Sequence, residues 1–305
     1  PAHVTLVAVR LPRLLAGLIA GAALGVAGTV MQALTRNPLA DPGILGVNAG
    51  AAFALLLGTS LIGRSDEAMV AVLSFPGAAL ASLAVFALGG GLRGDVGPVR
   101  LTLAGAALNA LLLSLVSAVA LVRQETLDVF RFWVAGSLTQ ATTRPLGAMA
   151  AVAALGGIIA LVIAPRIEAL SLGGALSRGL GTHPRRVQAG ALLVVTLTTG
   201  AAVAVAGPIA FLGLMVPPLA RLVSGHNLRA EMVVSAMAGA ALLASPRSLL
   251  ALTSNDLPAP LQRMDGDWQL TFQDDFDDLH RFQQTWDRMR IGGDGHPTMR
   301  YPKNV

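Results

Sequence analysis

The chain has 305 residues, of which 54% are hydrophobic and 13% are charged, and its mean hydropathy is +0.65. Soluble domains carry about 25% charged residues, so this composition excludes an ordinary soluble domain and indicates a membrane protein. The net charge of +5 comes from arginines that stand singly at the ends of apolar runs, which argues against nucleic-acid binding, and the absence of cysteine excludes disulfide bonds and thiolate metal sites.

Long apolar runs follow one another along most of the chain. A helix needs about 20 predominantly apolar residues to cross a bilayer. A shorter run, 209–223, contains Pro217-Pro218 and predicts a half-helix or a broken helix. We expect an all-α fold, a polytopic transmembrane bundle of about seven or eight spans, and the opening at Pro1 in mid-pattern predicts a truncated N-terminus. The runs that reach or approach spanning length are 14–34, 44–62, 68–90, 101–122, 145–165, 187–206 and 229–244.

The first run carries small residues on one face. Gly17, Gly21, Gly25 and Gly28 stand three or four positions apart, which places them on one side of a helix. Small residues let two helix backbones approach closely in lipid. This face is therefore predicted to pack tightly against a neighbouring helix.

A polar segment rich in proline and glycine, 36–50, separates the first two runs. Proline lacks an N–H group and biases the residue before it away from the helical region, and glycine lets the backbone turn. The segment is therefore predicted to be the short hinge between two membrane helices. Its candidate site residues are Arg36, Asn37, Pro38, Asp41, Pro42 and Gly43.

The arginines favour one orientation in the membrane. If the loop at 35–43 is cytoplasmic and the spans alternate, nine arginines fall on the cytoplasmic side and six on the opposite side, as the positive-inside rule prefers. The cytoplasmic set is Arg36, Arg93, Arg100, Arg166, Arg178, Arg185, Arg186, Arg221 and Arg229, and the opposite set is Arg10, Arg13, Arg64, Arg123, Arg131 and Arg144.

The densest polar loop on that side, 166–186, mixes arginines with glycines. Short helices separated by glycines suit an element that docks in a groove of a separate subunit, where arginines make charge-assisted contacts. A merely solvated loop is the alternative on spacing alone. The candidate docking residues are Glu168, Gly173, Arg178, Gly179, Gly181, Arg185 and Arg186.

Four residues within the apolar part are candidates for a transport pathway. Asn109 and Ser114 lie in the run 101–122, where an unpaired polar group is costly in lipid, so they either line a pathway or form hydrogen bonds between helices. Gly207 and Pro208 predict a bend that leads into the run 209–223.

Five separated motifs, in order, resemble those of the permease subunits of iron–siderophore, haem and vitamin B12 (cobalamin) ABC importers over about 10–244. The motifs are RLPR at 10–13; GAAL at 21–24 with Gln32 and RNPLADPGILG at 36–46; RFWVAGSL at 131–138; LSLG at 170–173 with SRGLG at 177–181; and AGPIAFLGLMVP at 206–217.

This resemblance implies a multi-pass subunit of a ten-helix permease fold in the bacterial cytoplasmic (inner) membrane. It also implies three kinds of protein partner: cytoplasmic ATP-binding subunits that dock on 166–186, a second permease copy in a homodimer or heterodimer, and a periplasmic or lipoprotein substrate-binding protein. The chain departs from the family where Pro217-Pro218 replaces the usual Pro-His, where no helix precedes Arg10, and where the last helix has no counterpart after Ala244. A non-functional, truncated or chimeric permease fragment is therefore the alternative interpretation.

The composition changes near residue 244. From Met264 onward the net charge is −3, against +8 for the preceding residues. We expect a permease domain at 1–244, a junction at 245–263, and an acidic, aromatic tail at 264–305 that is foreign or poorly packed. Residues 268–279 with Trp286 resemble the opening strand of family 16 glycoside hydrolases, but the catalytic Glu-x-Asp-x-x-Glu run of that family is absent, so hydrolase activity is not expected.

The chain is predicted not to be an enzyme. Its only lysine is Lys303 and it has no Gly-x-x-x-x-Gly-Lys phosphate-binding run, so ATP would be hydrolysed by a partner subunit. His183 and His226 stand without matching carboxylates, and no metal or other cofactor is expected. The sequence does not choose among siderophore, haem and cobalamin as cargo.

Overall fold

The computed structural model describes residues 10–62, 67–91, 98–122, 130, 133–134, 136, 138, 141–171, 174–179, 181–225 and 227–244. The chain separates into two units, 1–251 and 252–305, and the described residues all belong to the first. The predicted junction at 245–263 and tail at 264–305 lie outside the described residues, as do Gly173 and His226.

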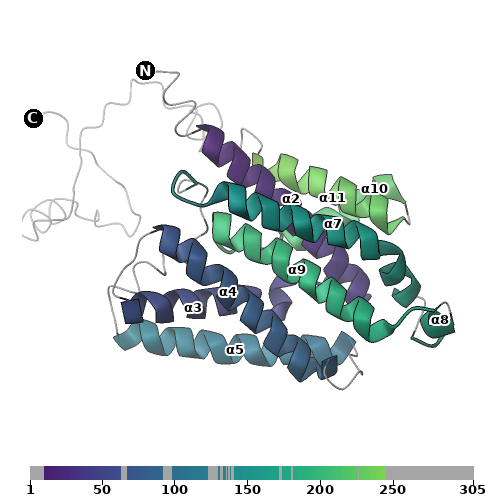
Figure 1. Cartoon of the computed structure of the whole chain (residues 1–305), viewed down its shortest axis with the longest axis horizontal. Coiled ribbons are helices and arrows are strands. Elements are labelled where there is room, and N and C mark those ends of the chain that lie inside the picture. Colours follow the sequence, from purple (N-terminus) through teal and green to yellow (C-terminus); the bar gives the residue numbers. More distant parts are fainter. Residues whose placement is uncertain are drawn as a thin grey trace, which may run out of the picture. The chain divides into compact units, whose positions relative to one another are not determined.

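The described residues form helices and connecting turns, with no strand among them (Figure 1). Every apolar run expected to be helical is helical, which confirms the all-α bundle. The elements are α2 (Leu11–Thr35), the short 3-10 helix η2 (Pro42–Leu45), α3 (Val47–Ile62), α4 (Glu67–Phe86) with the π-helical turn η3 (Ala87–Gly91), α5 (Pro98–Val122), α7 (Leu146–Ser171), α8 (Gly174–Gly179), α9 (Pro184–Ala206), α10 (Leu212–Ser224) and α11 (Leu228–Ala244).

Five helical segments in the described part of the chain are long and apolar enough to cross a membrane. Two other apolar helices are shorter than the runs predicted from the sequence: α3 has 16 residues and α10 has 13. α11, with 17 residues, matches the predicted run 229–244 to within one residue. α3 is short because Pro42–Leu45 forms a separate 3-10 turn, and α10 is short because the chain stays non-helical from 207 to 211. The five segments are Leu11–Thr35, Val72–Gly91, Val99–Leu121, Leu146–Ser171 and Pro184–Ala206.

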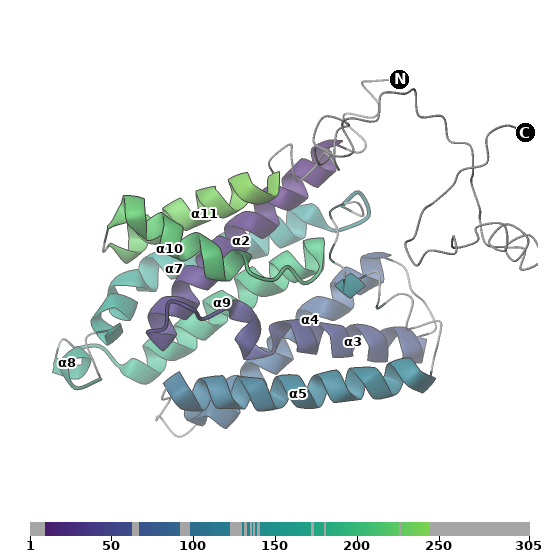
Figure 2. The same cartoon turned by 180° about the vertical axis from the view of Figure 1, so that it is seen from behind.

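Two helices form the centre of the bundle. In the spanning windows of α2 and α9, 72% of residues are buried, against 17% in α5 and 11% in α7. α2 packs against α7, α9, α10 and α11, while α4 joins α3 and α5 to α9 (Figures 1 and 2). The exposed apolar faces of α5 and α7 are therefore the surfaces left for lipid or for another subunit.

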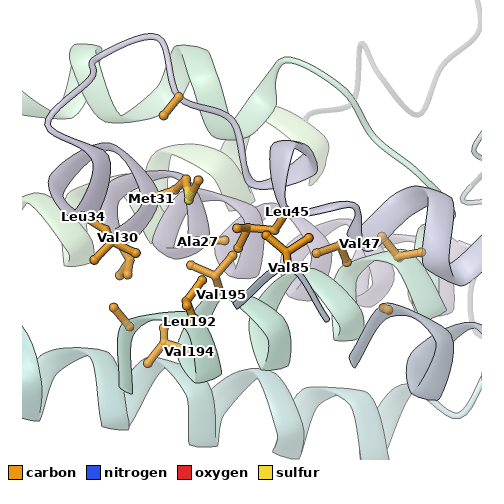
Figure 3. Packing of buried hydrophobic residues seen from close by; sticks show 14 of the residues in the cluster. Ala27, Val30, Met31, Leu34, Leu45, Val47, Val85, Leu192, Val194 and Val195 are labelled. Carbon is orange, nitrogen blue, oxygen red and sulfur yellow. The ribbon is translucent and has the colours of Figure 1, made fainter. Parts of the chain in front are cut away.

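The main core is built around α9, which packs against both α2 and α4 (Figure 3). Its buried side chains are almost all aliphatic, with Trp133 as an aromatic member, and they are fully or almost fully buried, as expected of interdigitating helix faces. The labelled members are Ala27, Val30, Met31 and Leu34 of α2, Leu45 and Val47 near the start of α3, Val85 of α4, and Leu192, Val194 and Val195 of α9.

The glycine face of α2 packs against α11, as predicted. A Cβ atom added at Gly21 would lie 2.2 Å from the carbonyl oxygen of Gly239, and one added at Gly25 would lie 2.2 Å from that of Ser235. The backbones therefore touch with no side chain between them. Beside this contact, the Thr29 hydroxyl donates a hydrogen bond of 2.9 Å to the Ser235 hydroxyl.

The predicted bend and half-helix are both present, but α10 is not broken. α9 ends at Ala206, and Gly207 caps it with φ of 76°, a conformation that glycine adopts without steric cost. α10 then runs from Leu212 to Ser224 as one helix that contains both Pro217 and Pro218. Of the two alternatives predicted for 209–223, the half-helix is therefore the one present. The Gly213 and Leu214 carbonyls, which the prolines leave without a backbone donor, lie within hydrogen-bond distance of the Gln32 side chain.

Candidate functional site

α3 begins at Val47, so the connection between α2 and α3 is the part 36–46 of the predicted hinge, and we use the name hinge for these residues from here on. It is built from side-chain hydrogen bonds to its own backbone. Arg36 ends α2 in the left-handed conformation, with φ of 53°. The side-chain oxygen of Asn37 accepts from the Leu39 N–H at 2.9 Å, and that of Asp41 accepts from the Gly43 N–H at 2.7 Å. Burial raises the pKa of the Asp41 carboxyl above its ordinary value, while the bond from Gly43 lowers it in part. The hinge therefore has a defined conformation.

The end of α7, α8 and the start of α9 form the segment 166–186, whose described arginines face outward. Arg178 lies in the last turn of α8, and Arg185 and Arg186 lie in the first turn of α9; all three are exposed. Gly179 is also exposed. The predicted docking surface therefore presents several cations on two short stretches of helix.

Gly181 gives this segment its shape. It has φ of 74°, its N–H donates to the Arg178 carbonyl at 3.0 Å, and the next N–H, of Thr182, donates to the Ser177 carbonyl at 3.0 Å. This pair of bonds is the Schellman arrangement that ends a helix with a left-handed residue. α8 therefore stops sharply, which lets Pro184 start α9 two residues after Thr182.

The last turn of α7 is tied to two other helices (Figures 1 and 2). The Arg36 guanidinium donates to the Leu170 carbonyl at 2.5 Å, which joins the hinge to α7. Two residues earlier, the Glu168 carboxylate accepts from the Leu228 N–H at 2.6 Å, which caps the first turn of α11. Glu168 thus bonds within the chain, whereas the arginines of 166–186 point outward. We call these two bonds the α7 junction.

The turn between α10 and α11 has its own ion pair. The Arg221 guanidinium and the Glu231 carboxylate lie 2.8 Å apart, with Glu231 almost fully buried. Asn227 caps α11 by accepting from the Arg229 and Ala230 N–H groups at 3.0 and 3.2 Å. The pairing of Arg221 with Glu231 is not among the contacts predicted from the sequence. The available signal was Glu231, the one acidic residue in the mainly apolar run 229–244.

The candidate pathway residues do not converge. Ser114 is exposed on α5 and Asn109 is half-buried on the same helix. Gly207 lies elsewhere, against the backbone of Trp133 and Gly136, where a Cβ atom would be 2.8 Å from the Trp133 carbonyl oxygen. The geometry accounts for Gly207 as a tight turn, with Pro208 following it out of α9.

A shallow cavity of about 250 Å³ lies between the hinge and the start of α5. Sites for small molecules usually measure about 300–1,000 Å³ and enclose most of the ligand. This cavity is smaller and does not suit a bulky cargo. It is lined by Thr35, Asn37, Ala40, Ile44, Val99, Thr102 and Leu103.

The chain matches the model of the FecCD transport family over residues 1–260. That match is wider than the resemblance noted at 10–244, and it gives no support to a glycoside hydrolase origin for the tail. The match explains why five motifs occur in the same order along the chain.

Curated relatives agree with this match. The chain is 47% identical to the ferric enterobactin transport system permease protein FepD of Escherichia coli (strain K12), over 77% of this chain and 70% of that protein. It is 39% identical to the probable siderophore transport system permease protein YfiZ of Bacillus subtilis (strain 168), over 79% and 72% of the two chains.

A solved structure is similar in fold. It is a metal-chelate type ABC transporter in an inward-facing conformation, with a TM-score of 0.71 and 27% identity, over 80% of this chain and 78% of that one. The apolar helices, the ordered motifs and these likenesses lead to one conclusion: the chain belongs to the FecCD transport family and is a multi-pass permease of the ABC transporter type.

Proposed function

We propose that this chain is the membrane-spanning subunit of an importer for ferric chelates, with a ferric siderophore as its cargo. The observation that carries the proposal is the 47% identity to a ferric enterobactin permease across about three quarters of this chain. Haem and cobalamin are less well supported, because the similar permeases bear names that refer to siderophores, iron hydroxamate and ferric citrate.

Energy for transport would come from ATP-binding subunits that dock on 166–186. The support is geometric: Arg178, Arg185 and Arg186 are exposed, while Glu168 and Arg36 tie the base of the same segment to α11 and α2. A force applied to the segment would therefore reach the hinge and α11 through the α7 junction. A second permease copy would complete the pathway, and a substrate-binding protein would deliver the cargo.

The docking proposal is tested by co-purification in detergent. The full chain is expressed with its cognate ATP-binding subunit, as wild type and with Arg178, Arg185 and Arg186 all replaced by Glu. We expect the wild type to retain the ATP-binding subunit and the triple variant to lose it, because charge reversal replaces attraction with repulsion. Arg10→Glu is the control. Arg10 is exposed and lies at the start of α2, the opposite end of this helix from Arg36 and the segment 166–186.

The cargo is tested by uptake of radiolabelled iron into cells that express the chain with its partners. Ferric enterobactin, iron hydroxamate and ferric citrate are compared, with cobalamin labelled at its cobalt atom as the control cargo. Saturable uptake of one iron chelate, lost in the triple variant, is the expected result. Failure of the wild type both to bind the ATP-binding subunit and to support any uptake would instead favour a non-functional permease.

A further inference from the structure

α10 has a backbone problem that follows from its sequence. A helical carbonyl accepts from the N–H four residues later, and proline has none, so Pro217 and Pro218 leave the carbonyls of Gly213 and Leu214 without that donor. The Leu214 carbonyl also lacks the alternative donor three residues later, because that residue is Pro217. Within a membrane protein, such groups need a partner from a neighbouring helix.

Gln32 of α2 supplies this partner. Its side-chain Nε2 donates to the Leu214 carbonyl at 3.1 Å and lies 3.5 Å from the Gly213 carbonyl. The shorter contact is to the Leu214 carbonyl, which lacks a backbone N–H donor both three and four residues later. Both neighbours are acceptors, so the amide must present its NH₂ group to them. One side chain thus stands in for two backbone donors that the prolines remove.

Glycines bring the two helices close enough for this contact. A Cβ atom at Gly28, one turn before Gln32, would lie 2.0 Å from the Gly213 carbonyl oxygen. On its other side Gly213 faces the hinge, since a Cβ atom there would lie 2.7 Å from Cδ of Pro42. The start of α10 is therefore seated between α2 and the hinge.

The surroundings of Oε1, the side-chain oxygen of Gln32, support the donor role of its NH₂ group. Gln32 is 1% exposed, and its Oε1 has no hydrogen-bond partner. A buried acceptor without a partner is costly, so a polar residue here needs a compensating contribution. Donation by Nε2 to the carbonyls left by the two prolines provides it.

We propose that Gln32 is a positioning residue of the permease: it replaces the donors missing at Pro217-Pro218 and thereby fixes α10 to α2 beside the hinge. Only the consequence for transport rests on the proposed function. The contact itself can be tested without any cargo.

The test is a double-mutant cycle on the full chain in lipid nanodiscs. Gln32→Met removes the donor at similar volume, and Pro218→Ala restores an N–H group for the Leu214 carbonyl. Because the chain has no cysteine, a spin label at Leu219→Cys, an exposed position on α10, reports the mobility of that helix alone. We expect Gln32→Met to raise label mobility and to lower Tm by about 2–4 °C.

In the Pro218→Ala background the same Gln32→Met change is expected to have at most about half of either effect, because the backbone then satisfies Leu214 itself. Thr29→Val is the matched control: Thr29 lies one turn from Gln32 but bonds to α11, so its effect should not depend on residue 218. Equal effects of Gln32→Met in both backgrounds, or no effect in either, would overturn the proposal.

Two further measurements keep the result interpretable. If Gln32→Met alone fails to fold, recovery of folded protein in the double variant supports the proposal, and equal failure of both contradicts it.

For transport, we expect Gln32→Met to lower the maximal rate of ferric chelate uptake without changing the half-saturating concentration. Adding Pro218→Ala to this variant is expected to restore the rate. Absence of all uptake by the wild type would count against the proposed function. The mobility of the spin label at position 219 would still test the contact between Gln32 and α10.

Discussion

Gly21 and Gly157 have the same side chain but very different surroundings. A Cβ atom at Gly21 would lie 2.2 Å from the Gly239 carbonyl oxygen on α11, whereas one at Gly157 on α7 would have no neighbour within 4 Å. Backbone atoms cannot move aside as the end of a side chain can. The cost of a methyl group at these two positions should therefore differ in sign.

We expect Gly21→Ala to destabilise the protein by about 1–3 kcal/mol through overpacking. Gly157→Ala should be neutral or stabilising by up to about 1 kcal/mol, because alanine favours the helix and has space there. Thermal unfolding of the two purified variants in one detergent compares them directly. A Gly21→Ala protein as stable as wild type would show that α2 and α11 do not touch through their backbones.

Asp41 gives the hinge a pH dependence whose sign can be stated. Burial raises the pKa of its carboxyl in the folded state, so the folded chain holds this proton more tightly than the unfolded chain. The contribution of Asp41 to stability is then largest below the ordinary carboxyl pKa and falls as pH rises through the raised pKa.

Asp41→Asn keeps an oxygen that can accept from the Gly43 N–H and removes the titration. We expect the variant to lose less stability than wild type between about pH 4 and pH 7, and to be at least as stable near neutrality. Tm measured across that range for both proteins checks this, and parallel curves would contradict it.

At the scale of elements, the α7 junction makes Glu168 more important than its half-buried position suggests. Its carboxylate caps α11 at 2.6 Å, next to the positive end of that helix. Losing such a cap costs about 0.5–2 kcal/mol, and here it also frees α11 from the segment that carries α8.

We therefore expect the Glu168→Ala permease to retain the ATP-binding subunit. The complex should still hydrolyse ATP but should take up less cargo for each ATP consumed. Glu168→Gln, whose side-chain oxygen can still accept from Leu228, should recover part of that ratio. Measuring ATP turnover and uptake on the same proteoliposomes gives the ratio. Loss of the ATP-binding subunit from Glu168→Ala would mean that Glu168 acts in docking instead.

The elements were predictable and the junctions between them were not. Helix positions follow from local apolar length, and the turn at Gly207 follows from Gly207-Pro208. The Glu168 contact joins residues 60 positions apart, and the Gln32 contact to Leu214 joins residues 182 positions apart. Such pairs depend on which helices become neighbours, which no local pattern specifies. Asn109 and Ser114 illustrate the same point: their polarity is visible in the sequence, but packing decides that Asn109 is half-buried and Ser114 exposed on α5.

At the scale of the whole molecule, the orientation deduced from arginines can be tested on single-cysteine variants. The chain lacks cysteine, so Arg178→Cys on α8 and Leu61→Cys near the end of α3 each give one reactive site, and both positions are exposed. We expect an impermeant maleimide added outside spheroplasts to label position 61 and to reach position 178 only after the membrane is opened. The reverse labelling pattern would mean that the bundle has the opposite orientation in the membrane.

The direct backbone contact of α2 with α11 has a consequence for motion. Two helices that meet glycine against carbonyl have no flexible side chains between them to absorb a small slip, so displacing one along the other requires separating them first. The pair should therefore travel as a single body during a transport cycle. A cross-link between α2 and α11 should then leave turnover unchanged, whereas one between α2 and a helix that shifts against it should stop the cycle.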